Sequence, residues 1–259
     1  MIDLHSHIIP GVDDGAENLE QTREALRLMQ AQGVRAIVTT PHFKGSTTAR
    51  PDLMDAHFEQ IDTQWALAKE MAASEFPDLR VERGVEVMLD SPSPDLSDPR
   101  LRLGEGSYLL LEFPFMSVPP QGPQALFRLR ADGLMPILAH PERYGNVTNI
   151  EMADEWRSVG ALLQVNCGSL LGRYGPIAER HAWALIERGW VDLLASDYHG
   201  RGGLHVEKCK MALLERGGEV QQELLMETNP SLILAGEETE PVPPLAVRRS
   251  FWNRLRGKS

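Results

Sequence analysis

Apolar runs that end in a histidine, aspartate or glutamate recur along this chain, and their recurrence constrains the fold more than any other feature. The first run starts at residue 1 and carries His5 and His7. Five further runs, at residues 36–42, 81–86, 108–112, 136–140 and 191–199, each deliver such a side chain at the same end. Because barrel enzymes carry their working residues at the carboxyl ends of parallel strands, this pattern indicates a metal site at the mouth of a parallel barrel.

Amphipathic segments separate these runs. Helical spacing of apolar residues or helix-like composition is found at residues 17–32, 53–73, 123–131, 151–159 and 176–188. With the run at 161–166, the strand-like runs number seven, and their alternation with helices favours a parallel barrel over an open doubly wound sheet. We therefore predict an α/β fold, a distorted (β/α)7 TIM-like barrel, which 259 residues can form as a single domain.

The ligand-type side chains are too numerous for one metal ion. In an extended strand, residues two apart point to the same face, so His5 and His7 can converge on one ion. An isolated pair of this kind would more often lie at the surface, but this pair recurs with others. The candidate ligands are His5, His7, Asp14, His42, Glu86, Glu112, His140, Asp197 and His199. Two or three divalent ions fit this number, and mixed imidazole and carboxylate ligation suits manganese, iron or zinc.

Several short motifs resemble those of the PHP superfamily, named for polymerase and histidinol phosphatase. They are Asp-x-His-x-His at residues 3–7, Thr-Pro-His at 40–42, Gly-x-Glu at 84–86, Ala-His-Pro-Glu-Arg at 139–143 and Ser-Asp-x-His at 196–199. Within the superfamily, residues 7–16 and 140–144 resemble the bacterial manganese-dependent protein-tyrosine phosphatases encoded with capsule and exopolysaccharide genes. The resemblance covers residues 1–236 and leaves outside it residues 237–259, a Pro-containing linker and a basic C-terminal tail.

The resemblance implies a centre of three metal ions, manganese first, with iron, zinc and magnesium as alternatives. The first ion would be held by His5, His7, Glu86 and Asp197. Glu86 would bridge to the second ion, shared with Glu112 and His140. The third would be held by Asp14, His42 and His199. Glu112 stands where many PHP phosphoesterases place a histidine, a difference that points toward the tyrosine-phosphatase branch.

The same resemblance implies a protein-tyrosine phosphatase in which metal-bound hydroxide attacks the phosphotyrosine of a bacterial autokinase that controls capsule or exopolysaccharide synthesis. A phenolate is a weaker base than an alkoxide, so its departure depends less on protonation by a general acid. Arg143, three residues after His140, is expected to bind phosphate, because a guanidinium fork can engage two oxygens at once. Arg201, only two residues past His199 where the family places its arginine further on, is the second candidate.

Three other interpretations compete with this one. A PHP phosphoesterase could act on a small monoester such as histidinol phosphate, and a non-catalytic regulator could bind a kinase without turnover. A third chemistry is suggested by Cys167 to Arg173, which matches the spacing of cysteine-dependent phosphatases. Asn166 precedes the cysteine where those enzymes carry a histidine, and a thiolate mechanism leaves the candidate ligands unexplained. We therefore interpret Cys167 as a small residue of a strand.

Charge and composition limit the partners and the compartment. A net charge of −11 argues against a nucleic acid partner. No apolar run approaches the ~20 residues that span a bilayer, and removal of a leader would remove His5, so we expect a cytoplasmic protein. Five basic side chains lie between residues 248 and 258. As a helix this tail would be basic and amphipathic, suited to peripheral contact with the inner face of a membrane, and a merely solubilising tail is the alternative.

Overall fold

The strands form two parallel sheets in this computed structural model, which describes residues 1–147 and 149–246. The smaller sheet has the order β1 (Ile2–Asp3), β2 (Ala36–Thr39), β4 (Arg80–Arg83). The larger sheet has the order β3 (His42–Lys44), β5 (Glu86–Met88), β6 (Tyr108–Glu112), β7 (Met135–Ala139), β8 (Leu162–Asn166), β9 (Leu193–Ala195). Every pair of neighbouring strands in both sheets is parallel, as the sequence predicted.

Two passes of the chain contribute to both sheets, because each breaks in the middle. The run at residues 36–42, expected as one strand, divides into β2 and β3 around Pro41, which has no backbone N–H for a sheet. The run at 81–86 divides into β4 and β5 around Gly84, where a Cβ would lie 2.5 Å from Leu103 Cδ2. With these pieces joined, seven parallel passes remain, and a parallel bridge between Ser6 and Tyr198 links the first pass to the last.

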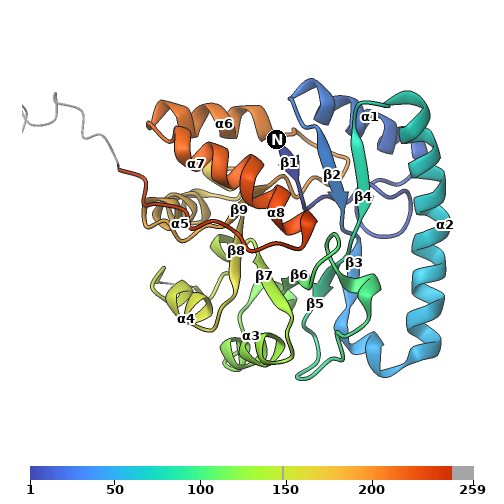
Figure 1. Ribbon diagram of the computed structural model, residues 1–259, viewed down its shortest axis with the longest axis horizontal. Coiled ribbons are helices and arrows are strands. Elements are labelled where there is room, and N and C mark those ends of the chain that lie inside the picture. The colour runs from blue at the N-terminus through green and yellow to red at the C-terminus, as the bar shows by residue number, and fades with distance from the viewer. Residues whose placement is uncertain (148, 247–259) are drawn as a thin grey trace, which may run out of the picture.

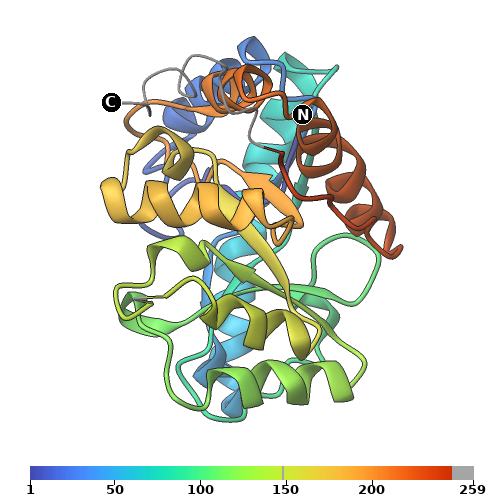
Figure 2. The ribbon, with the colours of Figure 1, turned by 90° about the vertical axis from the view of Figure 1, so that its left-hand side faces the viewer.

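Helices surround the strands (Figure 1). They are α1 (Leu19–Ala31), α2 (Pro51–Glu75), α3 (Gly122–Ala131), α4 (Met152–Ser158), α5 (Pro176–Glu187), α6 (Val206–Glu215), α7 (Glu219–Glu223) and α8 (Asn229–Ala235). A π-helical turn, Leu224–Thr228, joins α7 to α8. Both views place α1 and α6 at one end of the molecule and α3 at the other (Figure 2). Between β5 and β6 the described chain has no α-helix, only a 3-10 turn at Pro99–Leu101, so the barrel is irregular.

Local sequence explains why α1 lies where the periodicity predicted a helix. The Asn18 side chain accepts a hydrogen bond from the Gln21 N–H at 3.0 Å and caps the first turn. Buried residues recur at Thr22, Ala25 or Leu26, and Met29, so one face of the helix covers the strands. Gly33, with φ of +79°, takes the left-handed conformation that ends the helix.

Alternate residues of the strands face two apolar clusters. In β6, Leu109 and Leu111 pack in the larger cluster, whereas Tyr108 and Leu110 belong to a smaller one that also contains Ile233 of α8. The Tyr108 hydroxyl, at the first residue of β6, donates to the Glu237 carbonyl at 2.6 Å. The end of α8 therefore lies at the amino ends of the strands, and the carboxyl ends remain for the candidate ligands.

The Pro-containing segment after α8 packs against the barrel. Val242 and Leu245 are buried, and the Gln221 amide donates to the Pro243 carbonyl at 2.9 Å. The basic tail predicted for residues 248–258 lies outside the described residues. In the described part of the chain, none of the helices has the length and apolar character needed to cross a bilayer.

Asp192, just before β9, provides a test of this packing. Burial raises the pKa of its carboxyl to about 6, although the Leu163 N–H donates to Oδ2 at 2.8 Å. The pKa of Asp192 is higher in the folded protein than the value of about 3.9 expected in the unfolded chain. The protonated carboxyl therefore stabilises the fold fully below about pH 3.9, and this stabilisation is lost as the pH rises through about 6. Asp192→Asn should therefore raise the free energy of unfolding by about 1–2 kcal/mol at pH 8.

Urea unfolding of both proteins at pH 5 and pH 8 measures this effect. The gain should shrink toward pH 5, and Asp78→Asn, at an exposed position, should change stability little at either pH. A variant that is destabilised equally at both pH values would contradict the assignment of a buried carboxyl with a raised pKa.

Candidate metal centre

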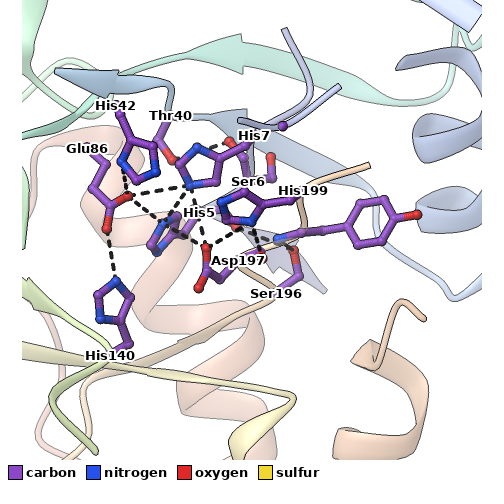
Figure 3. Close-up of polar contacts among 12 residues, drawn as sticks. His5, Ser6, His7, Thr40, His42, Glu86, His140, Ser196, Asp197 and His199 are labelled. Atoms are coloured by element: carbon purple, nitrogen blue, oxygen red, sulfur yellow. Dashed lines mark hydrogen bonds and ion pairs between the residues drawn. The ribbon is translucent and has the colours of Figure 1, made fainter. Parts of the chain in front are cut away.

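The structure brings all nine candidate ligands together at the carboxyl ends of the strands, and Figure 3 shows seven of them. In four sets, the donor atoms lie within 4.8 Å of one another: His7, Asp14, His42 and His199; His5, Glu86 and His140; His5, His7 and Asp197; His42, Glu86 and Glu112. These sets overlap more than the division implied by the resemblance, because His7 groups both with Asp197 and with the set that contains Asp14. The nine side chains form one continuous cluster.

His5 and His7 do not lie within a strand as expected, because β1 ends at Asp3. The extended course continues through hydrogen bonds to the last pass of the barrel: the Asp197 N–H donates to the His5 carbonyl and the His7 N–H to the Tyr198 carbonyl, both at 2.8 Å. The two rings still face one centre, with their Nε2 atoms 3.2 Å apart. The two histidines therefore converge as predicted, although they do not belong to a regular strand.

Glu86 contacts several histidines of the cluster (Figure 3). Its Oε2 is 3.2 Å from His5 Nε2 and 3.1 Å from His42 Nδ1, and its Oε1 is 3.1 Å from His140 Nε2. The side chain is buried, and the register of the larger sheet places Glu86 beside His42 on the next strand. Glu86 is thus the one candidate ligand that contacts histidines from three different passes, the geometry of a bridging carboxylate.

The electrostatics of the cluster favour cations. Burial alone would raise the pKa of Glu86, but the surrounding histidines, His5 first, hold the pKa of that carboxyl well below its usual range. Burial lowers the pKa of His42, yet the Glu112 and Glu86 carboxylates outweigh burial and raise it to about 10. Protons and metal ions compete for such donors, so metal affinity should fall at low pH.

The residues present fit divalent metal ions. Five imidazoles and four carboxylates make up the cluster, a donor set that suits manganese, iron or zinc better than soft ions. Glu86 Oε2 and His42 Nδ1 are buried 3.1 Å apart, and neither has a hydrogen-bond partner among the residues that the structure describes. Buried polar atoms seldom remain unpaired, and a cation bound between these two would satisfy both.

Two candidate ligands have a backbone conformation that non-glycine residues rarely adopt. His140, directly after β7, has φ of 38°, and Asp197, two residues after β9, has φ of 50°. Left-handed conformations of this kind cost free energy and persist at functional sites where the surroundings impose them. The turn at each strand end directs the side chain back toward the centre of the barrel.

Three supporting residues escaped the sequence analysis. The His7 Nδ1 and Asp13 Oδ2 atoms are 2.8 Å apart, and the same distance joins His5 Nδ1 to Gln164 Oε1. The Asn166 amide donates to Asp197 Oδ2 at 2.7 Å. Partners of this kind fix the orientation of metal ligands. Asp13 lies inside the motif at residues 7–16. Gln164 and Asn166 are polar residues two apart in the otherwise apolar strand β8, and this pattern could have indicated that they face the site.

Both arginines expected to bind phosphate lie beside the cluster. Arg143 Nη1 donates to Asp197 Oδ2 at 2.7 Å, and its guanidinium stacks 4.1 Å from the Tyr174 ring. Arg201 is more exposed, with Nη2 3.7 Å from Asp14 Oδ2. The two side chains line one cavity of about 230 Å³ with the ligands Asp14, Asp197 and His199.

Cys167 lies in an environment that opposes nucleophilic chemistry. The side chain is fully buried directly after β8. Contact with Cys209 and burial raise the pKa of the Cys167 thiol well above its ordinary value. A catalytic cysteine needs the opposite, a lowered pKa and access to solvent. Cys167 is therefore a small buried residue, as interpreted, but it lies one residue past the end of β8 and not within the strand.

The loops after β5 and β6 line a second cavity. Their residues, among them Pro92, Phe113 and Pro119, surround about 740 Å³ next to α3. The segment after β3 is not a loop of this kind, because it forms a 3-10 turn at Gly45–Ala49 and the start of α2.

Comparison with known proteins agrees with this geometry. The family model for capsular polysaccharide synthesis, CpsB/CapC, matches residues 1–235. The chain is 30% identical over 255 residues to the tyrosine-protein phosphatase YwqE of Bacillus subtilis, which covers 96% of this chain and 97% of that protein. It is 30% identical over 207 residues to the tyrosine-protein phosphatase CpsB of Streptococcus pneumoniae, covering 77% of this chain and 83% of that protein.

Solved structures give the same result. A structure from work on YwqE and CpsB, described as unique metal-dependent tyrosine phosphatases, matches with a TM-score of 0.77 and 28% identity, covering 95% of this chain and 100% of that one. A mutant organophosphorus hydrolase matches with a TM-score of 0.52 and 15% identity over 90% of this chain and 92% of that one, a likeness of fold alone.

Proposed function

The chain belongs to the CpsB/CapC family of capsular polysaccharide synthesis, and on that premise we propose how this metal-dependent tyrosine-protein phosphatase acts. The observation that carries the proposal is the convergence of nine imidazole and carboxylate side chains around Glu86. These side chains would hold up to three divalent ions, manganese first. When bound, the ions would withdraw charge from the phosphate and make a water molecule acidic enough to serve as the nucleophile at neutral pH.

Hydrogen bonds orient two of the histidines toward the centre of the cluster. Asp13 and Gln164 hold the Nδ1 atoms of His7 and His5, so each ring presents Nε2 to the centre. Glu86, buried among histidines from separate passes, has Oε2 beside His5 and Oε1 beside His140 and would help to hold more than one ion. Each ligand is oriented before substrate arrives, which reduces reorganisation during the reaction.

Arg143 would hold the phosphoryl group. Its hydrogen bond to Asp197 and its stacking on Tyr174 fix the plane of the guanidinium at the wall of the cavity. A planar fork in this position can bind two phosphate oxygens and stabilise charge that develops on them. Arg201 would add a second, weaker contact, because it is exposed and 3.7 Å from its nearest carboxylate.

We further propose that the substrate is a phosphotyrosine-bearing bacterial kinase of capsule or exopolysaccharide synthesis and that the enzyme acts in the cytoplasm. The family match supports the pathway, and the acidic net charge of −11 argues against nucleic acid as a partner. Contact of the basic tail with the membrane remains part of this hypothesis. Deleting residues 247–259 should then reduce sedimentation with anionic liposomes.

Hydrolysis rates on two classes of substrate test the proposed activity. We expect kcat/KM for a phosphotyrosine peptide to exceed that for histidinol phosphate by about 100-fold or more, because a phenolate with a pKa near 10 leaves without the strong general acid that an alkoxide requires. Both reactions are followed by release of inorganic phosphate from the manganese-loaded protein. Equal or faster hydrolysis of histidinol phosphate would favour the small-molecule phosphoesterase. Tight peptide binding without phosphate release would favour the non-catalytic regulator.

A further inference from the structure

The cavity beside the candidate metal centre is lined by a third arginine in addition to the two expected to bind phosphate. Its wall holds three arginines, Arg143, Arg173 and Arg201. The carboxylates of its lining are those of Asp14 and Asp197, and both are candidate metal ligands. Once these carboxylates are bound to cations, the three guanidinium groups leave the cavity positively charged, although the chain as a whole has a net charge of −11.

The three arginines differ in what holds them. Arg143 and Arg201 each contact the carboxylate of a candidate ligand, so both act close to the metals. Among the residues that the structure describes, Arg173 forms no ion pair with a carboxylate, and its polar contact is with His205 Nε2 at 3.4 Å. Arg173 therefore has a guanidinium that no acidic group of the described chain neutralises.

Two glycines lie directly beside the Arg173 side chain, which is exposed. A Cβ on Gly168 would lie 3.1 Å from the Arg173 Cδ, so the stem of the side chain crosses that glycine. A Cβ on Gly202 would lie 2.7 Å from Nη2, and this glycine has φ of +76°, which favours glycine. Burial and the charges of Arg173 and Lys208 lower the pKa of His205, so its neutral ring can accept a hydrogen bond from Arg173.

We propose that Arg173 binds a second anionic side chain of the substrate, adjacent in sequence to the phosphotyrosine at the metals. This inference rests on the proposed function and refines it: the preferred substrate is a phosphotyrosine with a carboxylate or a second phosphate beside it. The cavity that Arg173 lines also contains Asp14, Asp197 and His199, so both anions can be bound in one continuous space. A guanidinium without an acidic partner can bind such an anion without first breaking an ion pair.

Three phosphotyrosine peptides that differ only in the adjacent residue, glutamine, glutamate or phosphoserine, test the proposal with the manganese-loaded enzyme. The wild type should hydrolyse the two acidic peptides with kcat/KM about fivefold or more above the glutamine peptide, mainly through KM. The glutamate and phosphoserine peptides distinguish carboxylate from phosphate as the preferred group. The preference should weaken as salt is added, because the site is partly open to solvent.

Variants of one arginine at a time assign the preference to a side chain. Arg173→Gln should reduce it below about twofold, and Arg173→Lys, which keeps a charged stem over Gly168, should retain part of it. Arg180→Gln, at an exposed position of α5, removes the same charge and should keep the full preference. If Arg173→Gln lowers the melting temperature, the comparison of Arg173→Lys with Arg180→Gln still tests the assignment.

Several results would overturn the proposal. They are a wild type that does not distinguish the three peptides, an Arg173→Gln variant that keeps the full preference, and an equal loss in Arg180→Gln, which would indicate only long-range electrostatics. Failure of the wild type to hydrolyse any phosphotyrosine peptide would contradict the proposed function itself, a result distinct from hydrolysis without preference.

Discussion

Replacing Glu86 with glutamine is expected to lower kcat/KM for a phosphotyrosine peptide by about 1,000-fold or more and to reduce the metal bound per chain. The substitution preserves the volume of the side chain but removes the charge that three histidines surround at 3.1–3.2 Å. Without the carboxylate, no group joins His5, His42 and His140 in one centre. Elemental analysis of the purified protein and steady-state rates measure the two effects together.

Two control variants separate this effect from loss of charge in general and from cysteine chemistry. Glu82→Gln makes the same change on β4, at a position paired with Arg80, and should retain wild-type activity and metal content. Cys167→Ser should also keep its activity, because the buried thiol is not the nucleophile. An active Glu86→Gln protein that has lost metal, or a Cys167→Ser protein that has lost activity while keeping metal, would contradict the metal mechanism.

Most of the candidate ligands were predictable because they lie where an apolar run ends; Asp14 is the exception. Hydrophobic runs locate parallel strands, and parallel strands of one barrel bring their carboxyl ends together, so His140 and Asp197 meet His5 although the chain separates them widely. Residue type then identified metal chemistry without any knowledge of distances. The same reasoning placed α1, α2 and α5 nearly to their ends, because their periodicity and their Gly or Pro boundaries are local signals.

The features that escaped prediction depend on contacts distant in sequence. The break at Gly84 arises where Leu103 approaches the backbone, and a hydrophobic pattern does not report such an approach. Val242 and Leu245 occur in a Pro-rich segment that resembles a linker, yet both are buried against the barrel. Gln164 falls within the predicted strand at residues 161–166, but only the fold shows that its amide oxygen lies 2.8 Å from His5 Nδ1.

Arg143→Lys is expected to lower kcat/KM for the phosphotyrosine peptide by about 100-fold, and Arg143→Ala by at least as much. Lysine retains the positive charge, but it cannot donate two parallel hydrogen bonds to phosphate, nor stack as a plane 4.1 Å from Tyr174. The exposed Arg201 should matter less, with about a tenfold loss in Arg201→Lys. Phosphate release assays on the metal-loaded variants measure these losses.

Metal content decides how the loss in Arg143→Lys is interpreted. Arg143 also donates to Asp197, a candidate ligand, so the variant could fail because Asp197 no longer holds its ion. A direct role in phosphate binding requires normal metal content, reduced activity and weaker inhibition by inorganic phosphate. Arg180→Lys, on the exposed surface, should match the wild type in all three measurements. Wild-type rates in Arg143→Lys would show that charge alone suffices there, and the argument from the planar guanidinium would then be wrong.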